Sequence, residues 1–124
     1  MNECIYIFFI FIKMDVETSP EDKKKYSELL TPQWLAKEMI EKFIELNGSL
    51  ESLKIIEPCC GKGVFLVELL NHKAKIENLY WNDINPINVQ FCNLLLGVNK
   101  GTNIDALTID YSQYDLVITN PPYS

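Results

Sequence analysis

Apolar residues recur at helical spacing in three stretches of the chain, and each stretch predicts a helix. The first helix is expected to begin at Thr31-Pro32, because threonine favours the N-cap position and proline the first turn, and to stop at Asn47-Gly48. The second helix is expected over 64–71, and the third from Asn85-Pro86 to Gly97. The residues expected to form the apolar faces are Leu35, Met39, Phe43 and Leu46 in the first helix and Ile87, Phe91, Leu94 and Val98 in the third.

Short apolar runs between these helices predict strands at 54–57, 78–83 and 115–119, with a weaker strand at 102–105. Because strands and helices alternate, the predicted fold class is α/β, with an open sheet of about four parallel strands and helices on both faces. Ligands of such sheets bind beyond the carboxyl ends of the strands. The chemically suggestive residues all follow strands, so we expect a site at that edge of the sheet.

The chain before residue 27 has a different character. Residues 4–12 (CIYIFFIFI) form an apolar run about half as long as the ~20 residues that cross a bilayer, and they lack the cationic start of a signal peptide. Residues 15–25 are charged and contain a proline. We therefore predict an apolar leader and charged linker over 1–26, disordered or a non-native start, with the functional chain beginning near Met14. A buried strand is the alternative interpretation of the apolar run.

Composition narrows the function. The 124 residues suffice for one small domain, and the net charge is −6, with lysine as the only basic side chain apart from one histidine. A segment that grips nucleic acid tightly usually shows a basic, arginine-containing patch, so this segment is not expected to be one. The cysteines do not have the spacing of a zinc site or a disulfide framework, so we expect reduced thiols, no metal and a cytosolic protein. They are Cys4, Cys59, Cys60 and Cys92.

A glycine-bearing loop follows the first predicted strand of the domain, from Glu57 to Gly63. It matches neither the dinucleotide fingerprint nor the Walker pattern, but it allows the backbone to approach a ligand closely. Asp83, at the end of the next strand, is placed to accept hydrogen bonds from both hydroxyls of a ribose. Asp105 follows the weak strand and could accept a hydrogen bond from an adenine amino group.

The most specific motif is Asn120-Pro121-Pro122-Tyr123, directly after the last predicted strand. The two prolines fix the backbone and remove two N–H donors. The Asn120 side-chain oxygen and the Pro121 carbonyl could therefore accept both hydrogens of one exocyclic amino group. Tyr123 offers a ring on which a base could stack.

Several motifs occur in one order and together resemble the gamma arrangement of the amino-group DNA methyltransferases. They are Thr31-Pro32, Glu57-Pro58-x-x-Gly61-x-Gly63-x-Phe65, Asn82-Asp83, Asp105-Ala106-Leu107 and Asn120-Pro121-Pro122-Tyr123. The resemblance covers 27–124 as a partial catalytic domain. It implies the N-terminal half of a Rossmann-like S-adenosylmethionine-dependent methyltransferase fold. It also implies S-adenosylmethionine as cofactor and adenine in DNA as substrate, with the target base flipped out of the duplex.

The same resemblance implies roles for individual residues. Thr31 would contact the methionine carboxylate of the cofactor, Asp83 its ribose, and Asp105 with Ala106 its adenine. Phe65 would support the loop by packing, and Lys62 would point into solvent. The full set of implied cofactor-binding residues is Thr31, Glu57, Pro58, Cys59, Gly61, Gly63, Asp83, Ile84, Asp105, Ala106 and Asn120. The implied catalytic residues are Asn120, Pro121, Pro122 and Tyr123.

Two other readings of these motifs stay open. Methyltransferases that modify glutamine in release factors or guanine in ribosomal RNA share the final motif, although the glycine loop and the Thr31-Pro32 segment favour the DNA enzymes. Alternatively, the chain is a non-catalytic remnant or a subunit. We expect the truncated chain to be inactive alone and to need a C-terminal half, supplied in the same chain or by a second one. We also expect a cytoplasmic or nuclear rather than membrane location.

Overall fold

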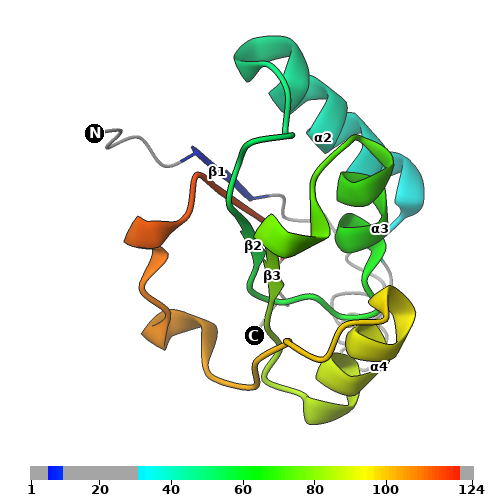
Figure 1. Cartoon of the computed structure of the whole chain (residues 1–124), viewed down its shortest axis with the longest axis vertical. Helices are drawn as coiled ribbons and strands as arrows, with labels where there is room; N and C mark the ends of the chain where they lie inside the picture. Colours follow the sequence, from blue (N-terminus) through cyan, green and yellow to red (C-terminus); the bar gives the residue numbers. More distant parts are fainter. Residues whose placement is uncertain (1–5, 10–30, 121–124) are drawn as a thin grey trace, which may run out of the picture.

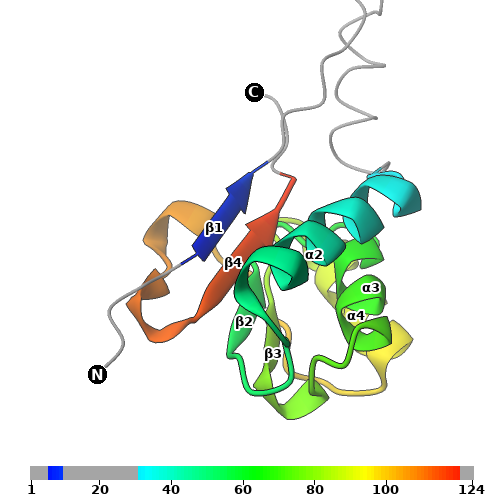
Figure 2. The ribbon, with the colours of Figure 1, turned by 90° about the horizontal axis from the view of Figure 1, so that it is seen from above.

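Four parallel strands form the sheet, in the order β1-β4-β2-β3. The computed structural model describes residues 31–120, together with the backbone of β1 (Tyr6–Phe9). β2 (Ile55–Glu57) pairs with β3 (Leu79–Trp81) on one side and with β4 (Leu116–Thr119) on the other. β1 pairs with the far side of β4, and Figure 2 shows the two strands side by side. The predicted α/β class and parallel sheet are confirmed.

The three α-helices of the described residues pack on one face of the sheet: α2 (Gln33–Asn47), α3 (Val64–Asn71) and α4 (Pro86–Leu96). On the other face lie two short 3-10 turns, η2 (Ala106–Thr108) and η3 (Tyr111–Gln113). Helices on both faces were expected. Among the described residues the second face has only these turns, because the stretch after 102 lacks a helical apolar period and its aspartates cap single turns instead.

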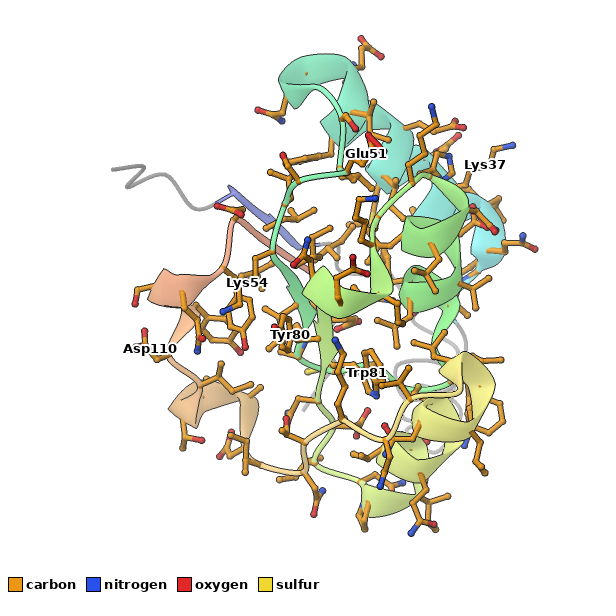
Figure 3. The ribbon with its side chains drawn as sticks, in the orientation of Figure 1. Lys37, Glu51, Lys54, Tyr80, Trp81 and Asp110 are labelled. Carbon is orange, nitrogen blue, oxygen red and sulfur yellow. The ribbon has the colours of Figure 1, made fainter. Side chains whose placement is uncertain are left out.

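The core lies between the helices and one face of the sheet (Figure 1). Side chains at alternate strand positions point into it, as the period of a strand requires. Its largest contributors are Ile55, Leu79, Trp81, Leu116 and Ile118 from the strands, Met39, Ile40 and Phe43 from α2, and Phe65, Leu66 and Leu69 from α3. On the opposite face the Lys54 ammonium lies 5.2 Å from the ring centres of both Tyr80 and Tyr114 (Figure 3).

The first helix keeps its predicted end but not its predicted start. It stops at Gly48, which has a φ of 92°. Pro32, not Thr31, occupies the N-cap position, and no side chain caps the helix. The predicted apolar face is confirmed only in part. Met39 and Phe43 are buried as expected, and the buried stripe consists of Ala36, Met39, Ile40 and Phe43. Leu46 is 63% exposed in the last turn.

The third helix has its predicted limits but turns a different face to the core. Asn85 caps it by accepting a hydrogen bond from the Ile87 N–H at 3.0 Å, and Gly97 ends it. The buried residues are Asn88, Val89 and Cys92, whereas Ile87, Phe91 and Leu94 are exposed. Apolar residues occur on several sides of this helix, so their period alone could not identify the inward face. A polar contact selects the inward face of α4. Asn93 Oδ1 accepts a hydrogen bond from Trp81 Nε1 of β3 at 2.8 Å, which holds this side of the helix towards the sheet.

The weak strand expected at 102–105 is reduced to a single bridge between Asn82 and Thr102. The Asn82 side-chain oxygen accepts hydrogen bonds from the Thr102 hydroxyl at 2.8 Å and the Ile104 N–H at 3.0 Å. A side chain therefore satisfies groups that a second β-pair would have used. Asp105 consequently does not end a strand but caps η2.

The division between a leader at 1–26 and a domain at 27–124 stays a prediction, but four residues placed in the leader form β1. The far edge of β4 is therefore paired, with Tyr6 opposite Leu116 and Phe9 opposite Thr119. Among the described residues, no helix has the length and apolar character that crossing a membrane requires.

Removing residues 1–13 should lower the stability of the chain. The deletion takes away β1 and exposes the backbone N–H and C=O groups on one side of β4. Each backbone hydrogen bond contributes roughly 0.5–1.5 kcal/mol net, so we expect a loss of about 1–3 kcal/mol after the ordering entropy of β1 is recovered. Urea unfolding of both chains measures the difference, and equal midpoints would show that β1 adds no stability.

Candidate functional site

The carboxyl ends of β2 and β3 are joined by the side chain of Asp83. Its Oδ2 accepts a hydrogen bond from the Gly61 N–H, and its Oδ1 accepts one from the Asn85 N–H, both at 2.8 Å. Asp83 thus fixes the glycine loop beside the end of β3 and the start of α4. Each carboxylate oxygen has a further lone pair, so the residue could still accept hydrogen bonds from a ligand.

Asn82 is a buried residue that the sequence motifs included beside Asp83 but to which they gave no role. Its Nδ2 donates to the carbonyls of Pro58 and Ile104 at 3.0 and 2.9 Å. With the two bonds that its Oδ1 accepts from Thr102 and Ile104, the amide is fully satisfied. It joins the glycine loop, β3 and residues 102–104. Its position beside Asp83 at a strand end was the available signal. Pro58, expected to touch the cofactor, is buried and contributes its carbonyl to this network.

The glycine loop depends on backbone conformations that suit glycine. Gly61 and Gly63 have φ values of 53° and 85°. A Cβ on Gly63 would lie 2.9 Å from a Leu95 methyl group and 3.3 Å from Cys92 Sγ. The loop therefore packs directly on α4, where the Cys92 thiol also donates a hydrogen bond to the Gly61 carbonyl at 3.3 Å.

Lys62 does not point into solvent as expected. Its Nζ donates to Asn88 Oδ1 at 2.9 Å and lies 5.0 Å from the centre of the Phe91 ring. The exposed ring of Phe91 gives the ammonium group a favourable surface, and the buried amide of Asn88 gives it an acceptor. Phe65 has the packing role predicted for it, with 3% of its surface exposed.

Glu57 is a buried carboxyl group at the end of β2, 1% exposed, and its Oε1 accepts a hydrogen bond from the Cys59 N–H at 2.8 Å. Burial raises the pKa of Glu57 to about 8, although the Cys59 N–H opposes this shift. Burial also raises the pKa of the Cys59 thiol to about 12, helped by the charges of Glu57, Asp83 and Asp105. The thiol therefore stays protonated and is a poor nucleophile.

Asp105, the third predicted carboxylate, lies near enough to Cys59 for its charge to raise the pKa of that thiol. Asp105 is exposed, and its Oδ1 accepts a hydrogen bond from the Leu107 N–H at 2.9 Å. Asn103 Nδ2 donates to the carbonyls of Asp83 and Ile84, each at 2.9 Å, and so holds this segment against the end of β3. Ile84 is 67% exposed and Leu107 92%, which places apolar side chains beside the carboxylates. The sequence motifs included Leu107 but gave it no role. Ala106 begins η2 and is half-buried.

Asn120 follows β4 directly and is 4% exposed. Its Nδ2 donates a hydrogen bond to Thr31 Oγ1 at 3.2 Å, whereas its Oδ1 is buried and has no hydrogen-bond partner within the described part of the chain. Pro121, Pro122 and Tyr123 lie outside the described residues, so their roles stay predictions.

The arrangement brings together a backbone loop, three carboxyl groups and a buried amide oxygen along one edge of the sheet. Such an edge suits a ligand with a positive charge, because carboxylates attract cations and the loop leaves room for close approach. Within the described ranges, no cluster of three or more His, Cys, Asp and Glu side chains has the arrangement of a metal site.

Comparisons with known proteins identify relatives of this chain. A family model described as "N-6 DNA Methylase" matches residues 14–124. The Type II methyltransferase M.VspI of Vibrio sp. (strain 343) is 32% identical over 111 residues, which are 82% of this chain and 26% of that protein. The chain therefore spans about a quarter of the length of this curated relative.

A solved structure shares the fold. It is a modification subunit of a putative type I restriction enzyme from Vibrio vulnificus YJ016, with a TM-score of 0.56 and 22% sequence identity. The similarity covers 77% of this chain and 24% of that subunit.

The buried carboxyl group predicts a specific pH dependence of stability. Because the pKa of Glu57 is raised from 4.5 to about 8 on folding, its contribution to stability is complete below pH 4.5 and is lost as the pH rises towards 8. Glu57→Gln should remove this loss, which is about 1.4 kcal/mol per pH unit at most. We expect the variant to be more stable than the wild type at pH 8. Between pH 5 and pH 8, the difference in unfolding free energy between the two proteins should change by a few kcal/mol in favour of the variant.

Urea unfolding at several pH values tests this expectation. Glu51→Gln is the matched control, because Glu51 is exposed in the turn after α2 (Figure 3). If the stability difference between wild type and Glu57→Gln does not change with pH, the carboxyl group is not buried as described.

Proposed function

Because this chain belongs to the N-6 DNA methylase family, we propose that it forms the cofactor-binding part of an enzyme that methylates the exocyclic amino group of adenine in DNA. S-adenosylmethionine is the proposed methyl donor. The chain spans about a quarter of its curated relative, so the complete enzyme would include further polypeptide, in the same chain or in a second one.

The observation that carries the proposal is the Asn120 amide. Its oxygen is a buried hydrogen-bond acceptor with no partner among the described residues, at the carboxyl end of β4, which is buried at all four positions. An unpaired buried acceptor costs about 1–3 kcal/mol, so its presence favours a ligand that donates a hydrogen bond there. An exocyclic amino group is such a donor.

The neighbouring residues fit the proposed cofactor. S-adenosylmethionine carries a positive sulfur and an ammonium group, and Asp83 and Asp105 supply negative charge at one edge. Glu57 adds a buried carboxyl group whose raised pKa of about 8 leaves it mostly protonated at neutral pH. Asp83 keeps lone pairs for a ribose diol, and the exposed side chains of Ile84 and Leu107 suit an apolar ring. When bound, the cofactor supplies a methyl group activated by its positively charged sulfur.

The proposed chemistry is a direct displacement. The lone pair of an adenine amino group is delocalised into the ring, which makes the nitrogen a weak nucleophile. Asn120 Oδ1 would accept one amino hydrogen and the Pro121 carbonyl the other, which favours a tetrahedral nitrogen. The N–C bond forms as the S–C bond breaks, and the excess proton leaves the nitrogen for solvent. Positioning supplies most of the acceleration, and Tyr123 would stack on the flipped base.

DNA is the proposed substrate rather than glutamine or RNA. The family description and the relatives' names, a Type II methyltransferase and a restriction-enzyme modification subunit, support this choice. Because the net charge of this chain is −6, we propose that it binds the cofactor and that further polypeptide supplies the basic surface that binds and distorts the duplex.

The proposal is tested by incubating labelled S-adenosylmethionine and adenine-containing DNA with the chain, alone and mixed with the remaining three quarters of the Vibrio relative. We expect N6-methyladenine, detected by mass spectrometry, from the mixture and little from the chain alone. Asn120→Ala should reduce the yield at least ~100-fold, as expected when a group that stabilises the transition state is removed.

Asp110→Ala is the matched control, because this exposed carboxylate directly precedes η3 and caps that turn by accepting a hydrogen bond from the Ser112 N–H (Figure 3). Methylation of guanine or of a protein glutamine by the mixture, with DNA adenine left unmodified, would replace the proposed substrate.

A further inference from the structure

We infer that Thr31 is a positioning residue for Asn120: its hydroxyl oxygen holds Nδ2, so that Oδ1 stays available to accept a hydrogen bond from the substrate amino group. The inference rests on the proposed function, because it concerns how the same asparagine is oriented for methyl transfer.

The contact joins two distant parts of the chain. Thr31 lies just before α2, and Asn120 lies directly after β4. The donor Nδ2 and the acceptor Oγ1 are 3.2 Å apart across 89 positions of sequence. Because Asn120 is 4% exposed, water has little access to its side chain and cannot easily replace this bond.

The threonine hydroxyl is not used where its sequence context places it. A threonine before a proline at a helix start is typical of an N-cap, whose hydroxyl accepts a hydrogen bond from the first turn. In α2 the N-cap is Pro32, and no side-chain cap is formed. The Thr31 hydroxyl is therefore available to Asn120. This bond explains why a residue with a hydroxyl group stands here although it does not cap the helix.

Orientation matters because an amide has two different ends. Rotating the Asn120 side chain by 180° would turn its NH2 group towards the substrate amine, and two donors cannot bond each other. The bond from Nδ2 to Thr31 favours the other orientation, in which Oδ1 is the unpaired atom. Substrate binding would then satisfy an acceptor that the protein leaves unpaired.

Two substitutions separate this role from simple packing. Thr31→Val keeps the shape of the side chain but cannot accept a hydrogen bond, whereas Thr31→Ser keeps the acceptor and loses a methyl group. The side-chain NH2 signals of Asn120 are followed in nitrogen–proton correlation spectra of the chain, and they are identified by their absence in Asn120→Asp.

We expect Thr31→Val to shift the Asn120 NH2 signals and to speed their hydrogen exchange about tenfold, the equivalent of losing a bond worth about 1.4 kcal/mol. Thr31→Ser should retain the wild-type signals. Affinity for S-adenosylmethionine is measured by calorimetry on the same variants, because the motif resemblance also implies a contact between Thr31 and the cofactor. If Thr31→Val does not fold, Thr31→Ala replaces it in the same comparison.

Unchanged Asn120 signals in Thr31→Val, or equal shifts in both variants, would overturn the inference. A loss of cofactor affinity in Thr31→Val with unmoved Asn120 signals would also overturn it, since the hydroxyl would then serve the cofactor. A wild-type chain that does not bind S-adenosylmethionine, but whose Asn120 signals respond as expected, would contradict the proposed function and leave the positioning contact intact.

Discussion

The hydrogen bond from the Gly61 N–H to Asp83 Oδ2, 2.8 Å long, is the contact on which the candidate site depends. It ties a loop after β2 to the end of β3, and the other oxygen of the same carboxylate fixes the start of α4 through Asn85. Without it, the loop would retain the contacts of Gly63 and Cys92 with α4 and the bonds to Asn82, but Gly61 would no longer be held by the carboxylate at the end of β3. Asp83 therefore has two roles: it holds the loop in place, and it is itself part of the candidate cofactor surface.

Asn82 extends the same principle to the rest of the edge. Its fully bonded amide connects the glycine loop with residues 102–104, and these in turn carry Asp105 and Leu107 to the end of β3. On the other side of β2, Asn120 follows β4, where its amide reaches back to the residue before α2. Buried amides rather than further strands thus hold the edge, and each is costly to leave unpaired. The amide oxygen of Asn120, which has no partner among the described residues, is accordingly the most informative atom of the site.

The sequence predicted what local signals control. The limits of α3 and α4 followed from apolar spacing, the Asn85 cap and Gly97, and the strands appeared as short apolar runs beside turn residues. Three features could not be read in this way. The inward face of α4 is selected by the bond between Trp81 and Asn93, which joins distant positions. The strand at 102–105 is replaced by bonds to the Asn82 side chain, and β1 is placed by its pairing with β4. Each of these depends on tertiary contacts that override local pattern.

For the candidate site, motif order predicted which residues gather, but not what they do in the folded chain. Asp83 and Glu57 were expected to face a ligand, and both also hold backbone N–H groups of the glycine loop. Thr31 was expected to cap a helix and instead bonds the predicted catalytic amide. A short motif specifies residue types at strand ends, whereas their partners are set by loop geometry that no single motif contains.

The most direct test of this account is the affinity of the chain for S-adenosylmethionine, measured by titration calorimetry for wild type, Asp83→Ala and the exposed-carboxylate control Asp110→Ala. The account predicts binding by wild type and by the control with equal affinity. It predicts a loss of about 1.5–3 kcal/mol for Asp83→Ala, typical of a hydrogen bond to a charged group. Equal affinity for all three proteins, or no binding by a folded wild-type chain, would contradict the claim that the edge held together by Asp83 binds the cofactor.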